Sequence, residues 1–82
     1  MDPLLHEVQD LLDTVERGDA AWPVRLRSLP EHMRLAARAR DVPALASLAE
    51  TLTQAVRLAD PERAQRVRRT LRHALQLLGG LG

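Results

Sequence analysis

The stretch DPERAQRVRRTLRHALQLLGG, residues 60–80, contains the signals of a complete helix from its start to its end. Asp60 before Pro61 is a typical helix start, because aspartate caps free N–H groups and proline fits the first turn. Gly79 and Gly80 are typical of a helix end. The residues between them repeat with the period of one apolar helical face, at Ala64, Val67, Leu71, Ala74, Leu75 and Leu78. The stretch therefore predicts an amphipathic helix over residues 61–78.

Three other segments carry similar start signals. Asp2-Pro3 predicts a helix over 3–17, which ends before Gly18. The capping-box pattern of residues 28–31, SLPE, predicts a helix over 29–40. Asp41, taken as a cap before Pro43, predicts a helix over 43–59. The expected core positions of these three helices are Leu4, Leu5, Val8, Leu11, Leu12, Val15, Leu29, Met33, Ala36, Ala37, Leu45, Leu48, Leu52, Ala55, Val56 and Ala59.

The composition favours the same fold class. The 82 residues include sixteen leucines and twelve alanines, which are strong helix formers, and no isoleucine, phenylalanine or tyrosine. The connections between the last three helices are very short, so neighbouring helices are expected to run antiparallel. The sequence thus predicts one all-α domain over residues 1–82, a small antiparallel four-helix bundle made of two helical hairpins.

Charge is unevenly distributed along the chain, although the formal net charge is only +1. Residues 1–19 carry six acidic side chains against Arg17, whereas residues 61–82 carry five arginines against Glu62. On a helical wheel centred on Leu71, the outward positions belong to Arg66, Arg69 and His73. The remaining arginines, Arg63, Arg68 and Arg72, flank the apolar face. These six residues are the candidate contacts for a partner.

Two functions suit this charge pattern. The first is a protein–protein interaction or oligomerisation module, in which the basic last helix meets the acidic first helix within one chain or across a homodimer, or meets another acidic protein. A thin core also favours self-association, because a second copy supplements it. The alternative is nucleic-acid binding by the arginine-rich face of the last helix. Trp22 is either an anchor for a partner or a residue packed over the end of the bundle.

Several other classes are not expected. The three histidines lie in different helices, no serine or threonine has a histidine base beside it in sequence, and no glycine-rich phosphate loop occurs. We therefore predict no catalytic site, no cofactor and no metal site, and cysteine is absent. No stretch approaches the ~20 apolar residues that span a bilayer. The first residues lack the basic and apolar regions of a secretory signal, so a cytoplasmic location is the expectation.

Overall fold

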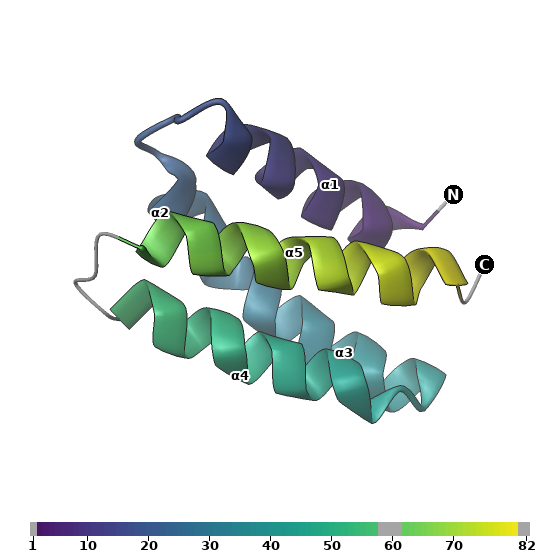
Figure 1. Cartoon of the computed structure of the whole chain (residues 1–82). Coiled ribbons are helices and arrows are strands. Elements are labelled where there is room, and N and C mark those ends of the chain that lie inside the picture. Colours follow the sequence, from purple (N-terminus) through teal and green to yellow (C-terminus); the bar gives the residue numbers. More distant parts are fainter. Residues whose placement is uncertain (1, 58–61, 81–82) are drawn as a thin grey trace.

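The computed structural model describes residues 2–57 and 62–80, and every regular element in these ranges is helical (Figure 1). The elements in chain order are α1 (Pro3–Glu16), α2 (Trp22–Arg25), the 3₁₀ turn η1 (Leu26–Ser28), α3 (Leu29–Arg40), α4 (Pro43–Arg57) and α5 (Arg63–Gly80). The described ranges contain no strand, which confirms the predicted all-α class.

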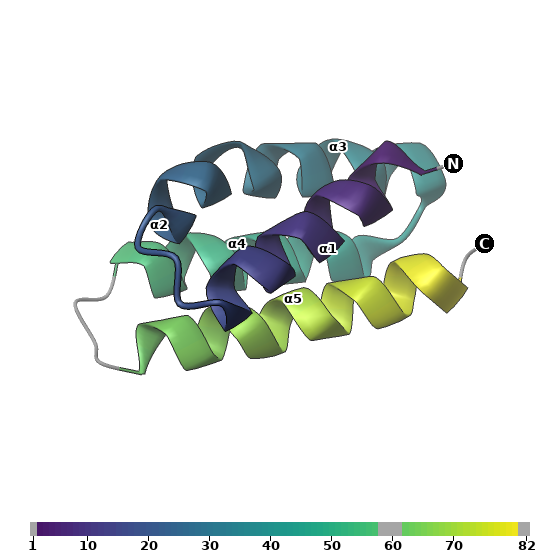
Figure 2. The ribbon, with the colours of Figure 1, turned by 90° about the horizontal axis from the view of Figure 1, so that it is seen from above.

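The four long helices run alternately up and down. α3 packs against α4, α4 against α5, and α5 against α1. Figures 1 and 2 show that α1 lies obliquely across the other helices and that its first turn shares one end of the bundle with the last turn of α5. Helices from the two ends of the sequence are therefore direct neighbours, and the acidic α1 lies beside the basic α5.

One continuous apolar cluster fills the space between the helices. Most of the expected core positions are buried in it, including Val8, Met33, Leu45 and Leu71. A second group of expected positions is only partly buried and packs against the edge of the cluster: Leu5, Ala36, Leu48, Val56, Ala64 and Leu75. Ala59 lies outside the described residues. The helical period thus predicted the inward faces correctly, with the edges less buried than expected.

Several buried residues were not predicted as core, Pro30 of α3 among them. Ala49 is fully buried, whereas its neighbour Leu48 lies at the edge of the cluster. Leu26 enters the core from η1. Thr14 and Thr70 are buried although they are polar, because each hydroxyl donates a hydrogen bond to the carbonyl four residues earlier, at 2.9 Å. Such a bond satisfies the hydroxyl without any other partner, so the burial is tolerated.

The ends of the first helix agree with their sequence signals. The Asp2 carboxylate accepts a hydrogen bond from the Leu4 N–H at 3.1 Å, as a cap should. Gly18 adopts a φ of 72°, which is left-handed backbone. The Asp19 N–H then donates to the Thr14 carbonyl and the Gly18 N–H to the Val15 carbonyl. These two bonds form the usual glycine termination of a helix.

Other helix boundaries differ from the prediction. Asp41 has a φ of 55° and closes α3, and the Val42 N–H donates to the Ala37 carbonyl at 2.9 Å. The predicted capping by Ser28 is wrong, because η1 leads into α3 with helical backbone and the Ser28 side chain makes no capping bond. α5 continues through Gly80 and does not stop at Leu78. The expected cap at Asp60 and start at Pro61 lie outside the described residues.

Candidate interaction surface

α5 carries its cationic side chains in two environments. Arg66, Arg69 and His73 are exposed, as the helical wheel predicted for its outward face. Arg72 is exposed as well, although the wheel placed it at the flank of the apolar face. Arg63 and Arg68 are half-buried at that flank. The outer face of α5 is therefore strongly basic over about two turns.

Trp22 belongs to the interior and not to this surface. Only 8% of the residue is exposed, and the Arg63 guanidinium lies over its ring at 5.2 Å from the centroid. Arg63 also donates a hydrogen bond to the Val56 carbonyl at 3.4 Å, so it connects α2, α4 and α5 at one end of the bundle. A cation over an aromatic face contributes about 0.5–1 kcal/mol at an exposed site. This geometry favours the interpretation of Trp22 as a packed residue. It also means that the Arg63 guanidinium already has partners within the chain.

The seam between α1 and α5 joins opposite charges. Arg72 donates to the Glu16 carboxylate at 2.9 Å, and both side chains remain accessible to solvent. Asp10 and Asp13 are exposed on the same helix as Glu16, and within the described ranges their carboxylates have no hydrogen bond or ion pair. An acidic outer face on α1 thus adjoins the basic outer face of α5. Exposed pairs of this kind contribute about 0–1 kcal/mol each, so they influence partner choice more than stability.

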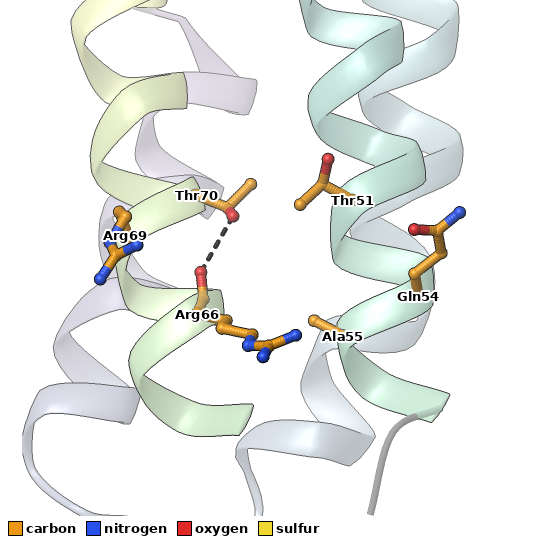
Figure 3. A pocket seen from close by; sticks show the side chains of 6 residues that line it. All are labelled: Thr51, Gln54, Ala55, Arg66, Arg69 and Thr70. Atoms are coloured by element: carbon orange, nitrogen blue, oxygen red, sulfur yellow. Dashed lines mark hydrogen bonds between the residues drawn. The ribbon is translucent and has the colours of Figure 1, made fainter. Parts of the chain in front are cut away.

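A groove runs between α4 and α5 on the outside of the bundle (Figure 3). Its inner hollow, of about 230 Å³, is lined by Thr51, Gln54, Ala55, Arg66, Arg69 and Thr70. Thr51 and Thr70 face each other across it, and the Arg66 side chain extends across it toward Ala55 (Figure 3). A second hollow, of about 500 Å³, shares Thr51, Arg69 and Thr70 and continues to Leu48, Arg72, His73 and Gln76. None of the described residues that line these two hollows is acidic.

Sequence reasoning found the arginine wall of this groove but missed the opposite wall. Thr51 and Gln54 are polar positions on α4, outside its apolar face, and nothing in their spacing marks them as part of a site. They become groove residues only because α4 packs beside α5. A polar position next to an apolar face is the only local signal that they carry.

The remaining ion pairs hold helices together. Arg40 makes a bidentate contact with Asp2, at 2.6 and 2.8 Å, and the His32 ring nitrogen Nδ1 lies 2.9 Å from Glu7. Both contacts join α1 to α3. The hydrogen bond from Arg40, opposed in part by desolvation, lowers the pKa of Asp2 to about 2, and the same contact raises the pKa of Arg40.

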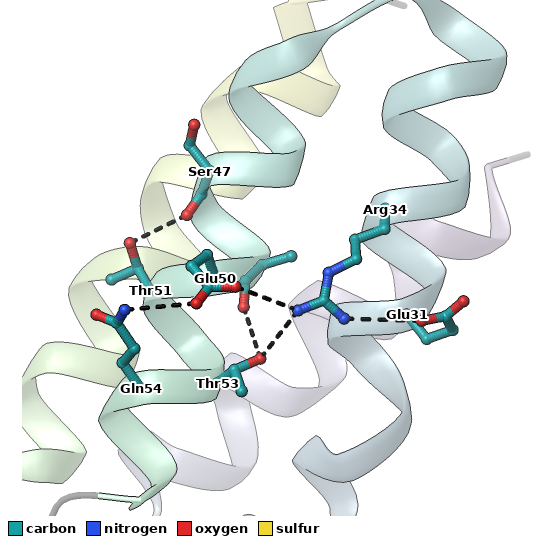
Figure 4. A network of polar contacts seen from close by, with 8 residues as sticks. Glu31, Arg34, Ser47, Glu50, Thr51, Thr53 and Gln54 are labelled. Atoms are coloured by element: carbon teal, nitrogen blue, oxygen red, sulfur yellow. Dashed lines mark hydrogen bonds and ion pairs between the residues drawn. The ribbon is translucent and has the colours of Figure 1, made fainter.

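A comparable network joins α3 to α4 (Figure 4). The Arg34 guanidinium lies 3.7 Å from Glu31 on its own helix and 3.5 Å from Glu50 on α4. It also donates to the Thr53 hydroxyl at 3.5 Å. Every charged group in this network therefore has a partner of opposite charge, and the network is structural.

Chemistry at the histidines depends on the groups around them. His6, His32 and His73 lie on α1, α3 and α5, and the described residues contain no group of three side chains placed to hold a metal ion.

Within the described ranges, no helix combines the length and the apolarity needed to cross a membrane.

The fold defines the class of this protein as a small, antiparallel, all-α helical bundle. No family model, no curated protein and no solved structure matches the chain.

Proposed function

We propose that the chain is a non-enzymatic protein–protein interaction module that associates with a second copy through the outer faces of α1 and α5. One observation carries this proposal: α1 and α5 are neighbours, and their exposed side chains have opposite charges. Asp10 and Asp13 are exposed on α1, and Arg69 and His73 are exposed on α5. A surface that is half acidic and half basic is complementary to itself.

A two-fold symmetric dimer can pair the acidic half of this surface with the basic half of the second copy. An axis through the seam places α1 of one copy against α5 of the other, and the same contact then occurs twice. Charges arranged in this way select the partner and fix the register of the two helices. The strength of the association must come from apolar area at the edges of the core, where Leu5 and Leu75 are only partly buried.

Nucleic-acid binding remains the second candidate. It is favoured by the groove between α4 and α5, where Arg66, Arg69 and His73 gather without a carboxylate in the two hollows. Two observations weaken it. Arg63 and Arg72 already contact Trp22 and Glu16, and the single tryptophan is buried, so no aromatic side chain is available to stack on bases.

A charge-swap experiment tests the self-association. In one variant, Asp10→Arg and Asp13→Arg make both outer faces basic; in the other, Arg69→Glu and His73→Glu make both acidic. Each variant alone should be monomeric in light scattering, because like charges then meet twice in the dimer. An equimolar mixture should recover the dimer, since each basic face meets an acidic one. The exposed pair Arg27→Glu and Arg38→Glu, on η1 and α3, serves as the control and should dimerise normally.

Other outcomes decide against the proposal. A parent chain that is monomeric at every concentration excludes it, and so does a dimer that both swapped variants form as well as the parent. Titration with duplex DNA and RNA at two salt concentrations tests the second candidate in parallel. Binding that collapses as salt rises, in a monomeric chain, would favour nucleic acid, because such binding depends on the release of counterions.

A further inference from the structure

The groove between α4 and α5 has the properties of a small ligand site. We propose that it binds the phosphate group of a small anionic ligand, either inorganic phosphate or a phosphomonoester. The inner hollow, of about 230 Å³, is smaller than the roughly 300–1,000 Å³ of a typical drug-sized site. It suits a group of a few atoms. The adjoining hollow, with Leu48 and Gln76 in its lining, has room for the rest of a phosphomonoester.

The charge of the groove points to an anion. The Arg66 guanidinium extends into the inner hollow (Figure 3). Arg69 stands on the rim of both hollows, and its guanidinium has no hydrogen bond or ion pair to any described residue. The His73 ring likewise makes no hydrogen bond or ion pair with any described residue. Guanidinium groups match phosphate oxygens with paired N–H donors. No acidic side chain lines either hollow, although Glu62 lines an adjoining hollow together with Arg66 and Arg69.

The neutral residues of the groove keep it open. Ala55 has only a methyl group where Arg66 approaches α4, so the hollow is not filled from that side. The Thr51 and Thr70 hydroxyls donate to the carbonyls of Ser47 and Arg66, at 3.1 and 2.9 Å. The threonine side chains on both walls are therefore small and polar, and these hydrogen bonds fix their orientation. This inference goes beyond the self-association, and because Arg69 and His73 belong both to the groove and to the face proposed for the dimer, a bound phosphate and a second copy would compete for them.

The test is a titration of the full-length, isotopically labelled chain, followed by two-dimensional NMR at constant ionic strength. The three arms are sodium phosphate, glycerol phosphate and sodium chloride. We expect amide shifts that saturate with phosphate or glycerol phosphate and that are centred on Thr51, Arg66 and Thr70. Tighter binding of glycerol phosphate would assign the outer hollow to the ester group, whereas equal binding would make inorganic phosphate the ligand. Sodium chloride should produce no saturable shift.

Matched variants locate the site. Arg66→Gln and Arg69→Gln should each weaken phosphate binding about tenfold or more, because each removes a charged hydrogen-bond donor. Arg38→Gln, on the exposed side of α3, should bind as the parent does. The circular dichroism spectrum of each variant shows whether it is folded, and Arg69 is exposed, so at least that variant keeps the test informative. Shifts that chloride reproduces, or that Arg38→Gln alters as much as Arg66→Gln, would overturn the proposal. Binding of duplex DNA without binding of phosphate would overturn it too.

Discussion

Leu71 lies at the centre of the bundle, and its truncation to alanine is the most direct test of the fold. Leu71 is completely buried, on the face of α5 that also contributes Val67, Ala74 and Leu78 to the core. Leu71→Ala removes three carbon atoms, and at about 0.8 kcal/mol for each buried methylene the transfer free energy alone costs about 2.4 kcal/mol. The residual cavity adds to this cost, so we expect a loss of about 3–5 kcal/mol in the free energy of unfolding.

That loss is large for a chain of this size. At about 0.05–0.15 kcal/mol per residue, 82 residues have a total stability of about 4–12 kcal/mol. Each kcal/mol shifts the Tm of so small a domain by about 4–8 °C, so Leu71→Ala should lower it by at least about 12 °C. The assay is thermal and urea unfolding, followed by circular dichroism and by the fluorescence of the single tryptophan. All samples are compared at one protein concentration, because self-association adds stability that depends on concentration.

Leu35 provides the matched control. It lies on α3 with 55% of its surface exposed, so Leu35→Ala makes the same chemical change without removing core contacts. We expect its effect to stay within about 0.5 kcal/mol. If Leu71→Ala unfolds like the parent, or if Leu35→Ala is as damaging, then the helix faces assigned here are wrong.

The remaining predictions concern single contacts. Gly18→Ala should lower the free energy of unfolding by about 1–2 kcal/mol, because a side chain there has open space but a left-handed φ of 72°. Gly79→Ala, on helical backbone with equal space, should be neutral or stabilising by up to about 1 kcal/mol in the same urea titration. Equal effects of the two substitutions would contradict this prediction. The pKa of Asp2 is lowered to about 2, so its contact with Arg40 stabilises the fold above about pH 4 and is lost as the pH falls toward 2. Asp2→Asn keeps a capping oxygen but not the charge; its stability deficit, measured by urea midpoints, should therefore shrink over that range, and a constant deficit would count against the ion pair. Arg63→Met should change the emission of Trp22, because it removes the cation from the ring, and should destabilise by about 1 kcal/mol. An unchanged spectrum would show that the two side chains are apart in solution.

Some features of the candidate surface follow from the local sequence, and others depend on contacts between distant parts of the chain. The outward direction of Arg66, Arg69 and His73 follows from the position of Leu71 in the helical period, and it was predictable for that reason. The pairing of Arg72 with Glu16 and the contact of Arg63 with Trp22 join residues far apart in the chain. No spacing within a helix encodes such contacts, so they could not be predicted.

Local signals in the sequence determined the four long helices, most of their buried faces and the basic side of the last helix. These features depend on propensity, on period and on neighbouring residues such as Asp2 and Gly18. The tertiary structure alone decided that α1 lies beside α5, that Trp22 is covered and that Thr51 faces Thr70 across a groove. It also decided that Asp41 ends one helix, where the sequence suggested that it begins the next. The physical reason is that the arrangement of the helices depends on the total apolar area that they bury together, and no single segment contains that information.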